Sequence, residues 1–281
     1  MTSYVRVHSL QEALDHLAGT PFRIVAGGTD VYPALVDRPL REPVLDLSGV
    51  SALRGIARDG EGFRLGALTT WTDVVRADLP SWFDGLKLAA REVGGVQIQN
   101  AGTVAGNICN ASPAADGTVA LLALEAEVEV QGPGGLRRMP LADFVLGPRK
   151  IALQAGEIVT AVHVPAPNEH GVADFLKLGS RHYLVISIVM VSAVIHVDDD
   201  ARVSRAGVAV GACSPVARRL AALEAKLTGR KLRDGLSGAL NASDLDGLSP
   251  ISDVRGTADY RRDAALTLVR RALERCEDAL Q

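Results

Sequence analysis

The sequence predicts an α+β protein in which three units follow one another along the chain. An apolar run ends in a Gly27-Gly28 turn, Pro165-Ala-Pro167 has the composition of a linker, and the last third combines hairpin strands with a long amphipathic helix. We therefore expect a small β-α-β unit (residues 1–57), a larger mixed α/β unit (58–167) and a small C-terminal α+β unit with an antiparallel sheet (168–281). A chain of 281 residues is long enough to bury a full core.

The first unit begins with a capping box. Ser9–Glu12 has the S-x-x-E pattern that starts a helix, and apolar residues follow it at helical spacing. Phe22–Val25 is expected to be a buried strand that runs directly into the Gly27-Gly28 turn. A short helix at Asp30–Val36 and a strand at Pro43–Leu47 complete the predicted β-α-β unit.

The second unit starts with a predicted strand at Phe63–Leu68. Thr70–Asp73 is a variant capping box that opens a helix, and Leu86–Val93 is a helix with an apolar face. A glycine-rich segment, 94–106, precedes a helix expected at Pro113–Leu124, for which Ser112 and Pro113 supply a cap and a first-turn proline. Two further strands are predicted, at Glu127–Gln131 and Glu157–Val164.

The third unit has three predicted strands, joined in part by an acidic hairpin turn at Asp198–Asp200. A helix is expected at Pro215–Leu227, with proline in its first turn. A long amphipathic helix at Ala258–Leu280 places Tyr260, Ala264, Leu268, Ala272 and Cys276 on one stripe. The strands are Ala173–Leu178, Leu184–Val197 and Val203–Gly211.

Composition excludes several classes of function. The net charge of −3 gives no basis for binding nucleic acid or an anionic membrane. The three cysteines are far apart, which does not fit a four-thiolate iron–sulfur cluster or a zinc site, so no metal ligands are predicted. The longest apolar stretch, Tyr183–Ile195, is too short to span a bilayer and no signal segment is evident. We expect a cytoplasmic protein without membrane insertion.

Two segments have the composition of phosphate-binding turns. Gly106 and Asn107, ahead of the helix start at Ser112, combine a close-approach glycine with an amide, and Thr103 adds a hydroxyl. The Gly27-Gly28 turn lies about 75 residues earlier, a separation typical of two parts of one domain. Together they suggest a large phosphorylated cofactor that is held along its length.

Plainer interpretations of both segments stay open. The first turn is preceded by a strand and followed by Asp46, as in a dinucleotide-binding fold, but the G-x-G-x-x-G fingerprint is absent. It is also compatible with a tight turn between two core elements. Ser112 can cap a helix, and Asp116 can lie in its first turn, without any ligand.

The sequence resembles the FAD-binding medium subunit of the molybdenum hydroxylases, which include the xanthine dehydrogenase and carbon monoxide dehydrogenase families. The resemblance is carried by Ala26-Gly-Gly-Thr-Asp30, Gln99-Asn-Ala-Gly-Thr-Val-Ala-Gly-Asn107 and Ala111-Ser-Pro-Ala-Ala-Asp116. It extends over nearly the whole chain, through Phe175-Leu-Lys-Leu-Gly-Ser-Arg181 and the C-terminal helix. It implies that the first two units form one FAD-binding domain and that the third is the family's C-terminal domain.

The resemblance also implies a function. FAD would be bound without a covalent link and would take electrons from the [2Fe–2S] clusters of a small partner subunit, then deliver them to an external acceptor. Substrate oxidation would occur at a molybdopterin cofactor on a large partner subunit, so no catalytic residue is expected in this chain. The complex would be a dimer of heterotrimers.

The family's FAD contacts map onto two groups of residues and a few single positions. The resemblance places the first group along the pyrophosphate and ribityl chain, and the second against the phosphates from the other side. Asp116 would bind a cofactor hydroxyl or an ordered polar group, Val159 would be an apolar neighbour of the flavin, and Lys177 would lie near the isoalloxazine ring unless it is a surface lysine. The first group is Ile24, Val25, Ala26, Gly27, Gly28, Thr29, Asp30 and Val31, and the second is Thr103, Gly106 and Asn107, with Ser112 at the helix start.

The sequence departs from the family pattern at three places. Ala105 stands where a second glycine is usual, His182 replaces an arginine, and Tyr183 follows it, where it could stack near the flavin or pack in the core. Two other functions were weighed: a stand-alone FAD-dependent oxidase and a cofactor-free interaction protein with this fold. The substrate and the acceptor, whether oxygen, a quinone or NAD, are not specified by the sequence.

Overall fold

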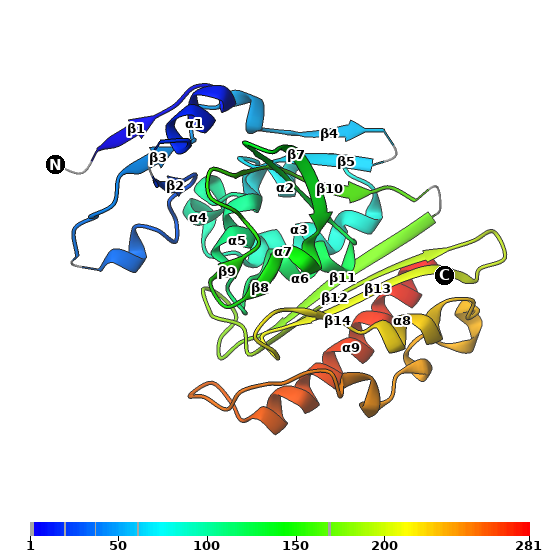
Figure 1. Ribbon diagram of the computed structural model, residues 1–281. Coiled ribbons are helices and arrows are strands. Elements are labelled where there is room, and N and C mark those ends of the chain that lie inside the picture. Colours follow the sequence, from blue (N-terminus) through cyan, green and yellow to red (C-terminus); the bar gives the residue numbers. More distant parts are fainter. Residues whose placement is uncertain (1–2, 20, 37, 61, 168–169) are drawn as a thin grey trace.

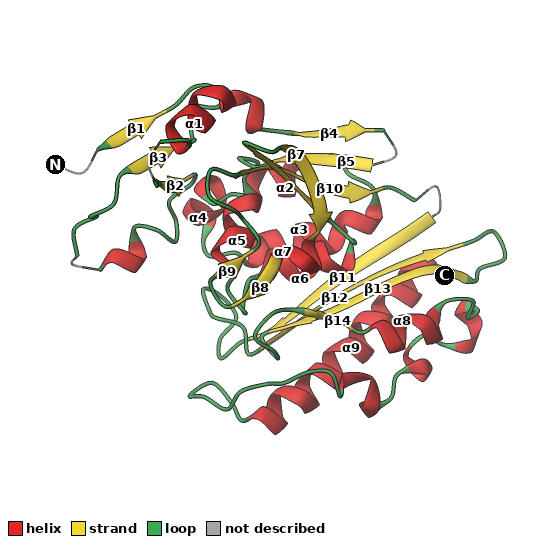
Figure 2. Cartoon of the chain, in the orientation of Figure 1, coloured by secondary structure: helices red, strands yellow, loops and turns green. Residues whose placement is uncertain are grey.

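The computed structural model describes residues 3–19, 21–36, 38–60, 62–167 and 170–281. Three main sheets succeed one another along the described part of the chain (Figure 1), and a further, two-stranded sheet is formed by β8 (Val145–Gly147) and β9 (Lys150–Ile151). A small N-terminal sheet lies at one end, a five-stranded sheet with helices forms the middle, and a four-stranded sheet with the C-terminal helix forms the other end (Figure 2). The predicted α+β class, with an antiparallel sheet in the last third, is confirmed.

The N-terminal sheet is parallel, in the order β1-β3-β2 (β1 Tyr4–Arg6, β2 Arg23–Val25, β3 Val44–Asp46). Helix α1 (Leu10–Leu17) connects β1 to β2, and the Ser9 hydroxyl caps it by accepting from the Glu12 N–H. The helix predicted at Asp30–Val36 is wrong. Only a 3-10 turn, η1 (Pro33–Leu35), forms there, because Val36 takes a φ of 50° and ends it after one turn.

The middle sheet is antiparallel, in the order β4-β5-β10-β6-β7. Helices α2 (Trp71–Arg76), α3 (Asp84–Glu92) and α6 (Asp116–Ala123) bury their apolar sides with one face of this sheet in the largest core of the molecule. The Thr70 capping box is confirmed, since hydroxyl and carboxylate bonds run in both directions between Thr70 and Asp73. The strands are β4 (Ile56–Asp59), β5 (Gly62–Gly66), β6 (Glu127–Gly132), β7 (Gly135–Pro140) and β10 (Ile158–Pro165).

The glycine-rich segment 94–106 contains helical structure that the sequence did not predict. It forms α4 (Val96–Ala101) and the start of α5 (Val104–Asn110), whose N-cap is Thr103. Val104 and Ile108 are fully buried, so tertiary packing outweighs the poor helix propensity of Gly106. The predicted helix start at Ser112 is also wrong: α5 ends at Asn110, its C-cap Ala111 has a φ of 47°, and α6 begins only at Asp116.

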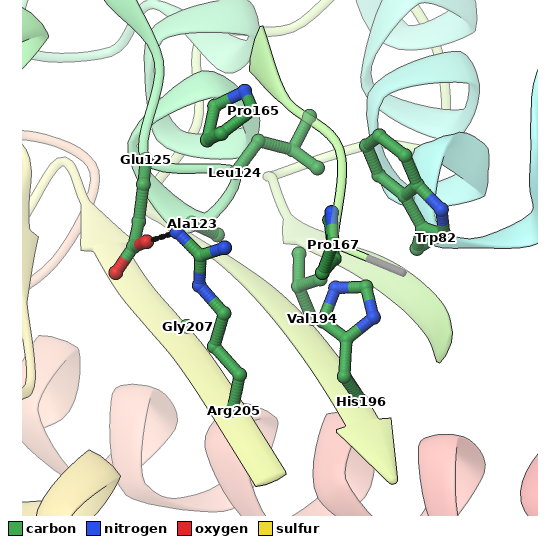
Figure 3. Close-up of a pocket in the computed structure, with 10 residues that line it drawn as sticks. All are labelled: Trp82, Ala123, Leu124, Glu125, Pro165, Pro167, Val194, His196, Arg205 and Gly207. Carbon is green, nitrogen blue, oxygen red and sulfur yellow. Dashed lines mark ion pairs between the residues drawn. The ribbon is translucent and has the colours of Figure 1, made fainter. Parts of the chain in front are cut away.

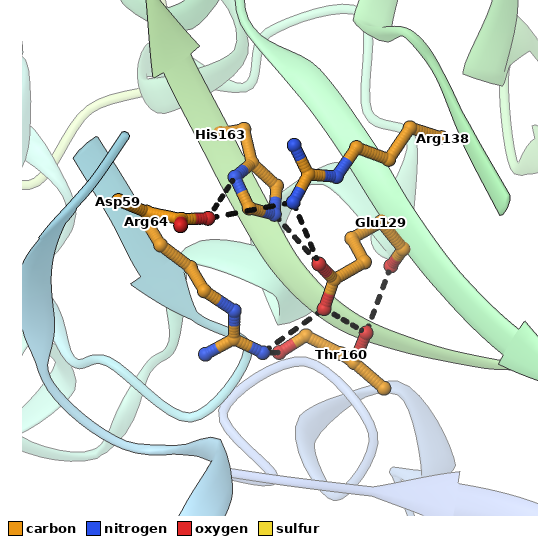
Figure 4. A network of polar contacts seen from close by, with 6 residues as sticks. All are labelled: Asp59, Arg64, Glu129, Arg138, Thr160 and His163. Carbon is orange, nitrogen blue, oxygen red and sulfur yellow. Dashed lines mark hydrogen bonds and ion pairs between the residues drawn. The ribbon is translucent and has the colours of Figure 1, made fainter. Parts of the chain in front are cut away.

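The other face of the middle sheet carries a buried polar cluster (Figure 4). Glu129 of β6 contacts Thr160 and His163 on the adjacent β10 and Arg64 on β5 beyond it, and its carboxylate is 2.7 Å from both Thr160 Oγ1 and His163 Nε2. Burial alone would raise the pKa of Glu129, but hydrogen bonds from Thr160, Arg64 and His163 lower it to about 2. The carboxylate is therefore a charged cross-link between strands.

The C-terminal sheet is antiparallel, in the order β11-β12-β13-β14. Helix α9 (Ala258–Leu280) packs against this sheet, as do α3 and α6. Every residue of β12 is buried, which explains its continuous apolar sequence. The strands are β11 (His170–Leu178), β12 (Val189–Val197), β13 (Val203–Gly211) and β14 (Arg218–Arg219).

Three details of this region differ from prediction. Strand β12 begins at Val189 rather than Leu184, and the helix predicted from Pro215 begins at Ala221, as α8 (Ala221–Leu227), because β14 occupies the residues before it. The Ala258–Leu280 helix is confirmed, but Tyr260 is 48% exposed and does not join its buried stripe. Remaining short elements are α7 (Leu141–Phe144), β8 (Val145–Gly147) and β9 (Lys150–Ile151).

Candidate functional site

A large cavity, of about 850 Å³, lies between the N-terminal sheet, helices α4–α6 and the end of β11. This volume is in the range of sites for organic ligands and cofactors. Of the residues that the resemblance implied, only Val25 does not line this cavity. It is the last residue of β2 and is buried, at 3% exposure. The predicted residues that line it are Ile24, Ala26, Gly27, Gly28, Thr29, Asp30, Val31, Thr103, Gly106, Asn107, Ser112, Asp116, Val159 and Lys177.

The Gly27-Gly28 turn forms one wall. A Cβ on Gly27 would overlap the carbonyl oxygen of Ala101 at the end of α4, so this glycine allows the two predicted motifs to touch. Gly28 has a φ of +70°, which favours glycine. The backbone N–H groups of residues 27–31 donate to no acceptor within the described part of the chain. A series of free N–H groups is suited to binding an anion.

Helix α5 forms the opposite wall. The Thr103 hydroxyl accepts a hydrogen bond from the Gly106 N–H at 3.0 Å, so it caps its own helix while remaining able to donate. A Cβ on Gly106 would lie 2.8 Å from that hydroxyl. Asn107 Oδ1 is buried and has no hydrogen-bond partner among the described residues. An unpaired buried acceptor costs about 1–3 kcal/mol, which a ligand donor would offset.

A buried ion pair lies at another part of the wall. Lys177 Nζ is 2.8 Å from Asp116 Oδ2, and the Ser187 hydroxyl donates to Asp116 Oδ1 at 3.0 Å. The side chains of Lys177 and Asp116 are 7% and 9% exposed, so Lys177 is not a surface lysine. Burial raises the pKa of Asp116 above its ordinary value, while Lys177 and Ser187 act in the opposite direction.

Sequence reasoning missed several residues of the lining. Arg149 reaches it from the turn between β8 and β9, with a φ of 59° and a hydrogen bond from its guanidinium to the Asn110 carbonyl. Only the preceding Gly147-Pro148 turn could have indicated it. Cys109 also contributes, and burial raises the pKa of its thiol to about 12. Trp71, fully buried, forms part of the same wall.

The departures from the family pattern have distinct outcomes. Ala105 lines the cavity at 6% exposure, so its methyl group is accommodated there. Tyr183 is 69% exposed, outside the cavity, and lies edge-on to His182 with ring centroids 4.2 Å apart. It does not pack in the core.

A smaller cavity between the middle and C-terminal sheets is not a site of this kind. Trp82 and His196 lie on one side of it and the Glu125–Arg205 ion pair on the other (Figure 3). Its volume of about 10 Å³ suits one water molecule. Among the described residues, no group of three or more potential metal ligands comes together, and no helix is long and apolar enough to cross a membrane.

The α+β fold, the large cavity and its free backbone N–H groups are the features of a protein that binds a large phosphorylated cofactor. Residues 1–167 match the family described as the FAD binding domain in molybdopterin dehydrogenase, and residues 174–276 match the CO dehydrogenase flavoprotein C-terminal domain. The chain therefore belongs to the family of FAD-binding subunits of the molybdenum hydroxylases. It is an oxidoreductase subunit whose cofactor is FAD.

Known proteins of this family are similar over almost their full length. The putative xanthine dehydrogenase FAD-binding subunit XdhB of Escherichia coli (strain K12) is 31% identical over 277 residues, covering 96% of this chain and 94% of that one. The glyceraldehyde dehydrogenase medium chain of Sulfolobus acidocaldarius is 31% identical and covers 97% of both. A carbon monoxide dehydrogenase structure from Hydrogenophaga pseudoflava has a TM-score of 0.90 at 27% identity, covering 99% and 98%.

Proposed function

We propose that this chain is the electron-transfer subunit of a heteromeric molybdenum hydroxylase, which takes electrons from the [2Fe–2S] clusters of a small partner and passes them to an external acceptor. Bound FAD would supply a centre that accepts electrons singly and releases two. The observation that carries this proposal is the 850 Å³ cavity with free backbone N–H groups on one wall and a buried ion pair on another. Several relatives are named as medium subunits, which supports a complex with small and large partners.

We propose an order in which the residues of the cavity contact FAD. The N–H groups of residues 27–31 would hold the pyrophosphate, and the first turn of α5 would approach it from the other side. The unpaired atom of Asn107 is a carbonyl oxygen, which can only accept. It therefore fits a hydroxyl of the ribityl chain better than a phosphate oxygen.

Lys177 and Val159 would lie beside the isoalloxazine ring. Val159 is 5% exposed and supplies an apolar contact, while the Lys177 ammonium would stabilise negative charge on the reduced ring. Asp116 reduces that effect because it already pairs with the ammonium. Asp116 and Ser187 would thus set how much of the lysine charge the ring experiences.

The remaining parts of the proposal concern organisation. We propose domains at residues 1–57, 58–167 and 168–281, a large partner that carries the molybdopterin, and a cytoplasmic complex without nucleic acid. The family match favours this role over a stand-alone FAD oxidase, and the free N–H groups and unpaired Asn107 oxygen favour it over a cofactor-free interaction protein.

The first test is the flavin content of the purified chain. We expect near-stoichiometric FAD, released on denaturation, in the wild-type protein and in a Gly134→Val control, because a Cβ on Gly134 meets no atom within 4 Å. Gly106→Val should remove FAD while the circular dichroism spectrum stays native. A Gly106→Val protein that retains a full equivalent of FAD would refute the placement of the pyrophosphate.

The second test separates the subunit from an oxidase. Purified FAD-loaded chain should not oxidise small-molecule donors by itself. Once photoreduced, it should be reoxidised by external acceptors. Turnover of a donor by the isolated chain would favour the stand-alone oxidase.

A further inference from the structure

A second cavity, of about 550 Å³, lies next to the first. It shares Glu92, Lys177 and Val185 with the FAD cavity and is otherwise separate. Its size is again in the range of small-molecule sites. Its lining is Leu88, Arg91, Glu92, Phe175–Gly179, Arg181, His182, Val185 and Arg275.

One wall of this second cavity is backbone. Five consecutive residues, 175–179, contribute to it, although alternate side chains of a strand point to opposite faces of the sheet. Strand β11 is at the edge of its sheet, and an edge strand presents unpaired N–H and C=O groups. Farther up the strand the edge is covered by η3 (Ser81–Phe83), where the Ser81 hydroxyl donates to the Gly171 carbonyl. The open edge is therefore short.

The other walls are basic. Arg91 comes from α3, Arg181 from the segment after β11, and Arg275 from α9, so three separate elements bring arginines to the lining of one cavity. Glu92 supplies the only carboxylate among the described residues that line it.

Among the described residues, only Arg275 of the three arginines is in an ion pair. Arg91 forms no side-chain ion pair or hydrogen bond with any residue that the structure describes. Arg181 donates to the carbonyl of Leu184 in its own segment, and Arg275 is 3.7 Å from Asp174. Single surface arginines are ordinarily just solvated. Three that converge on a concave site with an open strand edge form a favourable environment for negative charge.

We propose that this second cavity binds a small anion that carries phosphate or carboxylate groups. Guanidinium groups bind both kinds of oxyanion through paired N–H donors. The short open edge of β11 argues against an extended peptide, which would need a longer row of free backbone groups. The proposal goes beyond electron transfer and does not require FAD in the neighbouring cavity.

Isothermal titration calorimetry of the full chain with inorganic pyrophosphate tests this proposal. The chain is first saturated with FAD, so that pyrophosphate cannot occupy the FAD cavity. We expect one pyrophosphate per chain. Arg91→Gln and Arg275→Gln should each weaken binding about tenfold, equivalent to about 1.4 kcal/mol. Arg270→Gln, an exposed change on another side of α9, should bind like the wild type.

The results separate the two proposals. No pyrophosphate binding, or equal binding by the wild type and Arg91→Gln, would overturn the anion site whether or not the chain retains FAD. Arg91 is exposed and without a partner, so this variant should fold even if Arg275→Gln does not. If the chain binds no FAD, the same titration on the flavin-free protein still tests the second cavity through its dependence on Arg91.

The same variants identify the source of the anion. If the site receives the anionic end of the electron acceptor, pyrophosphate should compete with ferricyanide in reoxidising the photoreduced chain. If the anion is a separate effector, pyrophosphate should bind with the same dependence on Arg91 but without competition.

Discussion

Replacing Lys177 with methionine removes the ammonium group that lies 2.8 Å from Asp116 Oδ2. The aliphatic stem is nearly preserved, so the main change is that a carboxylate 9% exposed loses its counter-charge. Breaking one side of a buried ion pair costs about 3–5 kcal/mol. Because neither side chain is well solvated, little of this cost is screened. The Ser187 hydroxyl remains and keeps the loss at the lower end of that range.

The sign of the pH dependence follows from the direction of the pKa shift. Burial raises the pKa of Asp116 already in the wild type, and loss of Lys177 removes an influence that opposes this rise. A group with a raised folded-state pKa stabilises the fold below its unfolded pKa and loses that contribution as pH rises through the folded value. The free energy of unfolding that Lys177→Met loses relative to the wild type should therefore be smallest near pH 4 and grow towards pH 8.

Urea unfolding of flavin-free protein at several pH values measures this deficit. The fluorescence of Trp71 and Trp82, both buried, reports the transition, and the absence of FAD removes any contribution from ligand binding. Lys150→Met, at an exposed lysine, is the matched control. Lys177→Met combined with Asp116→Asn should regain part of the loss. A deficit below about 1 kcal/mol that is the same from pH 4 to pH 8 would refute the reasoning, since a broken buried pair costs several-fold more.

Further predictions concern other parts of the chain. Glu129→Gln should lower the free energy of unfolding by about 3 kcal/mol at pH 7, because the fold lowers the pKa of this carboxyl from 4.5 to about 2. The wild type should lose this stability as pH falls from 4.5 towards 2, and the variant should not. Glu42→Gln, at an exposed ion pair, is the control and should lose less than about 1 kcal/mol in the same urea titration. Asp116→Asn should raise the reduction potential of bound FAD by freeing Lys177, and an unchanged potential in spectroelectrochemistry would place the lysine away from the ring. Iodoacetamide at pH 7.5 should label Cys109 far more slowly than a peptide thiol, because its surroundings raise the pKa of the thiol to about 12; rapid labelling seen by mass spectrometry would contradict the raised pKa.

The sequence predicted best those elements whose ends carry their own signals. The Ser9 and Thr70 caps, the Asp198–Asp200 turn and the Ala258–Leu280 helix are local patterns, and each was confirmed. The Asp30–Val36 helix was wrong because such a short segment has little helical stability of its own.

The errors in the site region have a different cause. Helix α5 contains Gly106 and is held by the burial of Val104 and Ile108, which depends on contacts with distant elements. Arg149 reaches the cavity through a turn whose position is set by a hydrogen bond to the Ala111 carbonyl. No local pattern specifies such contacts, so only the family resemblance indicated that most of the lining would converge.

The FAD cavity takes its walls from all three parts of the chain: the turn at 24–31, the helices between 96 and 123, and the end of β11 with the segment that leads to Ser187. A ligand that contacts all three is bound tightly only when they are docked together. At 100 times its dissociation constant it would stabilise that arrangement by about 2.7 kcal/mol. Binding of the cofactor is therefore expected to hold the three parts of the chain together.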